Sequence, residues 1–162
     1  MLKKIKIKIK IKWYYDACTL DEKVYKKIFQ DVTSSKHPVM AVLSHLALGE
    51  VYGNLFSKKG KKQMDVFTDF LEALKRQRRI EIAGNDGVEE ILERVQGVLS
   101  SERNDFTDLV HIATAIGCGC SNILSDDRGL TGIETNKKDK IKKIAQEERG
   151  INDFGITWLK VK

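Results

Sequence analysis

The sequence predicts an α/β domain with a largely parallel central sheet. Short apolar runs alternate with longer amphipathic stretches along the whole chain, which is the pattern of βαβ units. The length of 162 residues is that of one ordinary domain, and no linker or internal repeat divides it. We therefore expect a single domain over residues 1–162.

The first strand begins in an unusual alternation of lysine and isoleucine over residues 4–12, which Trp13 continues on the apolar face. A period of two indicates a strand with one apolar and one positive face. A fully charged face cannot be buried in a central strand, so residues 1–12 are expected to form a basic extension, and residues 13–15 to enter the interior. This ribbon could bind a phosphate backbone, although lysines more often keep an edge strand soluble.

Capping signals and apolar spacing predict the next elements. Capping-box spacing at residues 19–22 begins a helix to about residue 32, with inward residues Val24, Ile28 and Phe29. A short strand is expected at residues 39–43. Ser44 then caps a second helix, whose apolar positions are Leu46, Val51, Leu55 and Phe56.

Beyond a basic turn at residues 58–62, helical spacing predicts a third helix through residues 64–74, and a short strand is expected at residues 78–82. A capping box at Asp86 opens a helix to residue 99, and Asp105 caps another. The remaining predictions are a buried strand at 121–125, a loop at 131–136, a helix at 140–149 ended by Gly150, and a strand at 156–161.

Composition restricts the function classes. The formal charge of +6 and the pI near 9.2 favour polyanionic partners such as nucleic acid, although a charged fraction of 32% is also typical of heat-adapted surfaces. No apolar run approaches the ~20 residues of a membrane span. The odd cysteine count, Cys18, Cys118 and Cys120, fits a reducing cytosol, so a cytoplasmic protein without membrane contact is expected.

Four acidic residues carry the functional signal: Asp16, Glu50, Asp108 and Asp127. Asp16 and Asp127 follow predicted strands, and the other two lie on predicted helices. In open α/β sheets ligands bind outside the carboxyl ends of the strands, so these acids can converge on one cleft. Clustered carboxylates repel one another unless a cation joins them, and their oxygens suit Mg²⁺ or Mn²⁺.

Residues 105–115 and 122–128 resemble the C-terminal half of the PIN-domain nucleases, in which an Asp-x-x-His/Ile-x-Ala-x-Ala helix precedes a strand ending in Thr/Ser-x-Asp. Residues 14–18 are similar to the first strand of that family with its metal-binding Asp. Residues 44–55 are similar to the family helix that carries a Glu. These elements occur in the family's order and span most of the chain.

This resemblance implies a Rossmann-like three-layer sandwich in which Asp16, Glu50, Asp108 and Asp127 are both the catalytic and the metal-binding residues. One or two Mg²⁺ or Mn²⁺ ions would activate a water for attack on an RNA phosphodiester. The protein would be a VapC-like toxin of a toxin–antitoxin pair or a related prokaryotic RNA-processing ribonuclease. RNA, an antitoxin protein and a second copy in a homodimer are the partners that it implies.

The positions differ in how specific they are. Asp126 and Asp127 are adjacent, and Asp127 is chosen by its spacing from Ser125. A Glu on a helix is usually a surface residue, so Glu50 is the least specific of the four acids. Asp105 is expected mainly as a helix cap, and an outer role at the metal is its second interpretation. Two departures from the family pattern are Cys18, where Ser or Thr is common, and the pair Gly129-Leu130, where acidic or aromatic residues are common.

Other interpretations compete with the nuclease. A zinc site could combine His37, His45, His111 and the cysteines, but Cys118-Gly119-Cys120 is a single pair without zinc-site spacing. An aspartyl-phosphate phosphatase would need a second Asp where Cys18 stands. No Walker loop predicts ATP binding. A PIN-like module that binds nucleic acid or protein without turnover is the main alternative.

Two lysine runs are candidates for holding RNA beside the cleft. They occupy residues 58–62 and 137–143. Lysines that neutralise phosphates release counterions and so favour binding. Solvated surface charge is the more common role of such runs.

Overall fold

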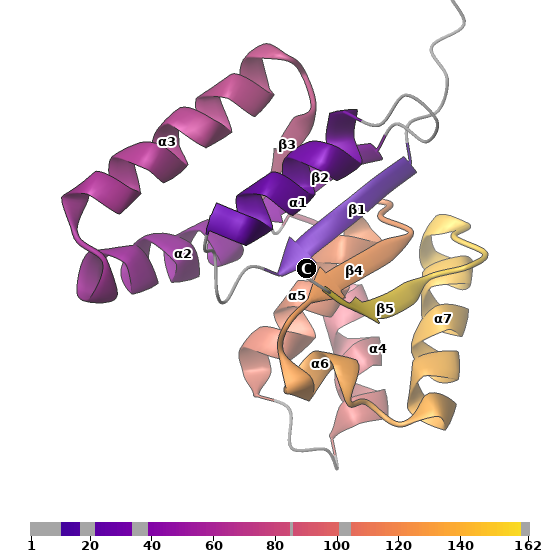
Figure 1. Cartoon of the computed structure of the whole chain (residues 1–162). Helices are drawn as coiled ribbons and strands as arrows, with labels where there is room; N and C mark the ends of the chain where they lie inside the picture. The colour runs from indigo at the N-terminus through magenta and orange to yellow at the C-terminus, as the bar shows by residue number, and fades with distance from the viewer. Residues whose placement is uncertain (1–10, 17–21, 34–38, 85, 101–104, 160–162) are drawn as a thin grey trace, which may run out of the picture.

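The structure is a computed structural model that describes residues 11–16, 22–33, 39–84, 86–100 and 105–159. Five parallel strands form one sheet in the order β3-β2-β1-β4-β5 (Figure 1). They are β1 (Ile11–Asp16), β2 (Val39–Ser44), β3 (Ile80–Ala83), β4 (Asn122–Ser125) and β5 (Gly155–Trp158).

Helices cover both faces of this sheet. The helices α1 (Glu22–Thr33), α2 (His45–Lys58) and α3 (Lys61–Arg76) pack on one face. The helices α4 (Glu89–Leu99), α5 (Phe106–Gly117) and α7 (Thr135–Arg149) pack on the other, together with Leu130 of the short α6 (Arg128–Thr131). The predicted three-layer α/β sandwich is confirmed, and its described sheet is entirely parallel.

Strand alternation decides which side chains meet which helices. Tyr14, Val42 and Ile123 lie in the core under α4, α5 and α7. Their neighbours Tyr15, Leu43 and Leu124 lie in the core under α1, α2 and α3. Side chains two residues apart on a strand share a face. The polar residues at the strand ends, Asp16, Ser44 and Ser125, therefore point toward the α5 side.

β1 is the middle strand and the point where the strand order reverses. It pairs with β2 on one side and with β4 on the other, all in parallel. Crevices form outside the carboxyl ends of the strands at such a point. Asp16, the last residue of β1, lies there.

Several predicted helix boundaries are confirmed. The Ser44 Oγ accepts a hydrogen bond from the Ala47 N–H at 3.0 Å and begins α2, and the Asp105 carboxylate caps α5. Gly150 ends α7 in the left-handed region, with φ of 64°. The strands at residues 39–43 and 121–125 are present, each within one residue.

Two phenylalanines predicted to face inward are exposed. Phe29 is 44% exposed because the buried stripe of α1 is Val24, Ile28 and Val32, a four-residue repeat that excludes it. Phe56 is 77% exposed because it lies one residue past the buried Leu55. An apolar residue next to a helical stripe faces about 100° away from it.

Three local predictions were wrong. Asp86 does not cap α4, whose N-cap is Val88 without a side-chain hydrogen bond. The loop expected at residues 131–136 contains the end of α6 and the start of α7. α7 begins at Thr135, five residues before the expected position, because polar residues in its first turn masked the helical period.

The isoleucine–lysine extension lies mostly outside the described residues, as does the capping box at 19–21. Lys12 is described, and its Nζ lies 2.8 Å from Glu81 Oε2 while donating to the Cys118 carbonyl at 3.3 Å. The Lys12 side chain therefore contacts both β3 and the end of α5.

Among the described residues, no helix combines the length and the apolar character needed to cross a membrane.

Replacement of Ser44 by alanine tests how α2 is positioned. Ser44→Ala removes the helix cap and a hydrogen bond to the buried Tyr14 hydroxyl, so the free energy of unfolding should fall by about 1–2 kcal/mol. Urea denaturation measures this loss. The exposed Ser57→Ala variant, in the last turn of the same helix, should change stability by less than about 0.5 kcal/mol. Equal stability of both variants would contradict the role given to Ser44.

Candidate metal centre

Asp16 is the buried carboxylate at the centre of the site. It is 1% exposed at the carboxyl end of β1. Its partner in the strand register is Ser125 of β4, and both side chains point to the same face. The Ser125 hydroxyl accordingly donates to Asp16 Oδ2 at 2.7 Å. This bond leaves Oδ1 directed toward the neighbouring helices.

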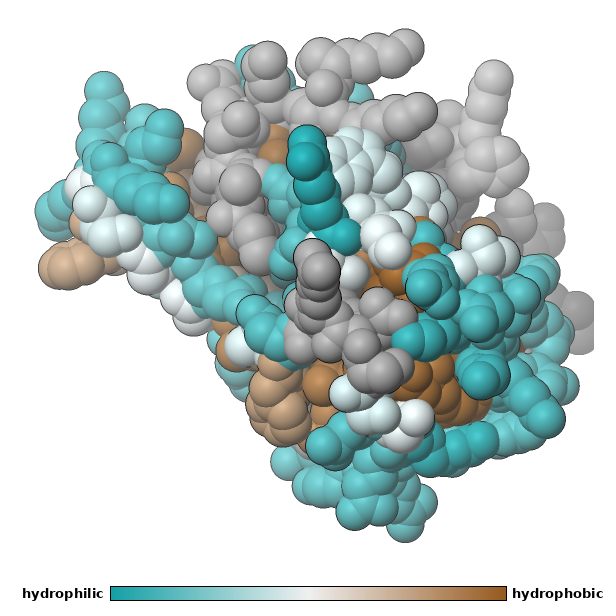
Figure 2. Space-filling view, turned by 90° about the horizontal axis from the view of Figure 1, so that it is seen from below, coloured by the Kyte–Doolittle hydropathy of each residue, from teal (hydrophilic) through white to brown (hydrophobic). Residues whose placement is uncertain are grey.

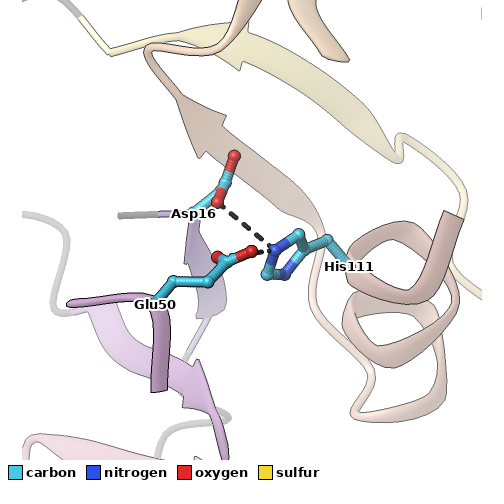
Figure 3. A group of neighbouring side chains, drawn as sticks. All are labelled: Asp16, Glu50 and His111. Atoms are coloured by element: carbon cyan, nitrogen blue, oxygen red, sulfur yellow. Dashed lines mark hydrogen bonds and ion pairs between the residues drawn. The ribbon is translucent and has the colours of Figure 1, made fainter. Parts of the chain in front are cut away.

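Glu50 and His111 complete a compact group with Asp16 (Figure 3). Glu50 comes from α2 and His111 from α5, which packs across β1, β2 and β4. His111 Nε2 lies 3.1 Å from Glu50 Oε2 and 3.5 Å from Asp16 Oδ1. One potential ligand atom from each of the three residues lies within 4.8 Å of the others.

The His111 ring is fixed from its other side. Its Nδ1 lies 2.6 Å from the Tyr14 hydroxyl, which lies 2.7 Å from Ser44 Oγ. All three residues are at most 1% exposed. A hydrogen-bonded chain thus runs from the cap of α2, through β1, to the imidazole of α5 and the carboxylates. It determines the orientation of Nε2.

Asp108 and Asp127 form a second pair of carboxylates around Gly129. An ideal Cβ on Gly129 would lie 3.0 Å from Asp108 Oδ2 and 3.2 Å from Asp127 Oδ1. Asp127 caps α6 by accepting from the Gly129 N–H at 2.7 Å, and its own N–H donates to Ser125 Oγ at 2.9 Å. Ser125 therefore links this pair to Asp16.

The structure thus brings the four predicted acids to one edge of the sheet, in two linked groups. Asp16 and Glu50 belong to the group with His111. Asp108, which is 6% exposed, and the half-buried Asp127 belong to the group at Gly129. β4 ends at Ser125, so neither Asp126 nor Asp127 is on a strand, and only Asp127 has the described role as helix cap.

Asp105 lies at the exposed margin of the site. Its carboxylate caps α5 through the Asp108 N–H at 3.1 Å and accepts from the Thr107 hydroxyl. The Thr107 bond, followed by the cap bond, holds the pKa of Asp105 below its ordinary value. Asp105 therefore adds a negative charge close to Glu50 and His111.

The pKa of Glu50 reflects its burial and the charges around it. Burial raises its pKa above the ordinary value, His111 opposes the rise, and the Asp16 and Asp105 charges add to it. The same carboxylate would be favoured in its charged form by a bound cation. The electrostatics of the site therefore favour a positive charge between these side chains.

The donor set fits a divalent ion. Ligand atoms about 2.1 Å from an octahedral ion and at right angles to each other lie about 3 Å apart. The 3.1 Å and 3.5 Å separations at His111 Nε2 are close to that spacing. Asp16, Glu50 and His111 could hold such an ion, with Asp108 and Asp127 close by.

Sequence reasoning identified the acids but gave His111 no place among them. It considered His111 as a residue of the helix motif that follows Asp108 and as part of a zinc site with cysteines, but not as a ligand beside the acids. His45 is exposed at the start of α2, and Cys118 and Cys120 follow the C-terminal end of α5, so none of them joins His111. His37 lies outside the described residues. The family motif itself, with His three residues after Asp108, was the available signal.

The two basic runs lie at different places. The turn at residues 58–62 is the exposed α2–α3 tip, which projects on the left of Figure 2 with mainly hydrophilic residues. It is about 12 Å along α2 from Glu50, given a rise of about 1.5 Å per residue. The start of α7 is attached to α6, because Lys138 Nζ donates to the Thr131 carbonyl at 2.7 Å. This end of α7 is therefore next to the helix that Asp127 caps.

Comparison with protein-family models, with curated proteins and with solved structures finds no match to this chain. The class that the fold and geometry define is an α/β sandwich with an acidic site that can hold a metal.

Gly129→Ala tests the packing of the second carboxylate pair. The added methyl group would displace the carboxylates of Asp108 and Asp127, so Mn²⁺ affinity should fall about tenfold, as for changes that disturb ligand orientation. Isothermal titration calorimetry measures this affinity. Gly97→Ala on α4, where a Cβ meets nothing within 4 Å, is the matched control. Wild-type Mn²⁺ affinity in Gly129→Ala would contradict the placement.

Proposed function

We propose that this protein is a metal-dependent endoribonuclease of the PIN type. The observation that carries the proposal is the buried Asp16 carboxylate at the switch point of the sheet, with Glu50 and His111 beside it. The neighbouring Asp108 and Asp127 supply the other two acids of the resemblance. Fold alone does not define function, so the proposal depends on this site.

The chain's own residues would hold and orient the reacting groups. Ser125 fixes Asp16 through Oδ2, which directs Oδ1 into the site. Asp16 and Glu50 would hold a Mg²⁺ or Mn²⁺ ion, and Asp108 and Asp127 would orient the water or a second ion. When bound, a divalent ion neutralises the scissile phosphate and lowers the pKa of a water ligand. Hydrolysis then needs no nucleophilic side chain.

A polyanionic substrate agrees with the charge of the chain. The surplus of six positive charges, with lysines at the start of α7, favours binding of a phosphate backbone. RNA is the proposed substrate. We further propose a cytoplasmic setting, where Cys118 and Cys120 would remain free thiols, and a role as toxin with an antitoxin partner or in RNA processing.

Replacement of the central acids tests the proposal. Asp16→Asn and Asp108→Asn should each lower the rate of RNA cleavage in Mn²⁺ by at least about 100-fold. The first removes a charge that would hold the ion, and the second removes one that would orient the water or a second ion. Cleavage of a labelled single-stranded RNA by purified protein measures this rate. Chelation by EDTA should abolish cleavage in the wild type.

The exposed Asp65→Asn variant on α3 is the matched control and should cleave at the wild-type rate. Undiminished cleavage by Asp16→Asn would contradict the proposal. So would RNA binding that survives chelation with no hydrolysis in any divalent ion, which is the behaviour of a binding module.

A further inference from the structure

His111 is an imidazole in a site otherwise made of carboxylates. It is 1% exposed, and its Nε2 points between Glu50 Oε2 and Asp16 Oδ1 (Figure 3). A buried histidine with one nitrogen facing two carboxylates has the position of a ligand. The acids alone would make an all-oxygen site, so this nitrogen changes the chemistry of the site.

The other nitrogen of the ring has the partner that a metal ligand requires. A histidine bound to metal through Nε2 keeps its proton on Nδ1, which needs an acceptor. The Tyr14 oxygen, 2.6 Å away, can accept this proton's bond, while the Tyr14 hydroxyl donates to Ser44 Oγ at 2.7 Å. In this arrangement the lone pair of Nε2 faces the carboxylates.

The same chain supports a second arrangement of protons. With the proton on Nε2, His111 donates to Glu50, and its Nδ1 accepts from the Tyr14 hydroxyl. The ring needs no rotation between the two arrangements. His111 is therefore oriented in advance for an ion, and its hydrogen bond to Glu50 holds the site together without one.

We propose that His111 is a nitrogen ligand of the metal, and that the site consequently selects Mn²⁺ and later transition ions over Mg²⁺. This inference rests on the metal site of the proposed function and specifies it. Affinity at sites containing nitrogen rises from Mn²⁺ toward Ni²⁺, whereas Mg²⁺ retains its preference for oxygen. The Tyr14 bond makes Tyr14 a positioning residue for this ligand.

Pulsed EPR of Mn²⁺-loaded protein tests nitrogen coordination without any measurement of activity. The wild type should show a ¹⁴N coupling to Mn²⁺, which should change to the ¹⁵N frequency when the protein is produced with ¹⁵N-histidine. The coupling should be lost in His111→Gln and kept in His45→Gln, the control on an exposed histidine. Absence of histidine coupling in Mn²⁺-loaded wild type would overturn the proposal.

Metal titrations test selectivity. Wild-type protein should bind Mn²⁺ at least about tenfold more tightly than Mg²⁺, and His111→Gln should lose at least about tenfold of its Mn²⁺ affinity with less than about threefold change for Mg²⁺. Tyr14→Phe, which keeps the buried ring, should lose about tenfold for Mn²⁺ through loss of the Nδ1 partner. Equal Mn²⁺ affinity in wild type, His111→Gln and Tyr14→Phe would contradict the assignment.

These results distinguish failure of the nitrogen-ligand proposal from failure of the nuclease proposal. Histidine coupling in a protein that cleaves no RNA would support the nitrogen ligand and contradict the nuclease. RNA cleavage in Mn²⁺ without histidine coupling would support the nuclease and contradict the nitrogen ligand.

Discussion

The candidate site depends on the burial of one carboxylate, that of Asp16, where the strand order of a parallel sheet reverses. A buried carboxylate is costly unless hydrogen bonds or an opposite charge stabilise it. Here Ser125 supplies one hydrogen bond, and His111 lies on the other side of the carboxylate. The remaining acids increase the negative charge, so a bound cation would stabilise the whole group.

Side-chain alternation along the strands places the other polar groups on the same face of the sheet as Asp16. Tyr14 and Asp16 point to the α5 side of β1, and Ser44 and Ser125 do the same at the ends of β2 and β4. On α5, Asp108, His111 and Ala115 are buried and lie three and four residues apart, so they share one face of the helix. The polar chain from Ser44 through Tyr14 and His111 to Glu50 therefore connects β2 and α2 with β1 and α5. Ser44, Tyr14 and His111 are buried and orient the imidazole toward the half-buried Glu50.

Much of the fold could be predicted because strand and helix periods are local properties of the sequence. The failures were also local: Phe29 and Phe56 lie next to a buried stripe, and the first turn of α7 is polar. The convergence of the acids followed from the rule for strand ends. The role of His111 did not, because its partners Tyr14 and Glu50 are 97 and 61 residues away. The spacing of His111 from Asp108 was the local signal in the sequence, and it does not identify these distant partners.

The central claim is that Asp16, Glu50 and His111 bind one divalent ion. The most direct measurement is an anomalous difference map from a crystal grown with Mn²⁺ and recorded near the manganese absorption edge. The account predicts a peak within coordination distance of Asp16 Oδ1, Glu50 and His111 Nε2. A map in which Mn²⁺ occupies other positions, while these three side chains contact only one another, would contradict it.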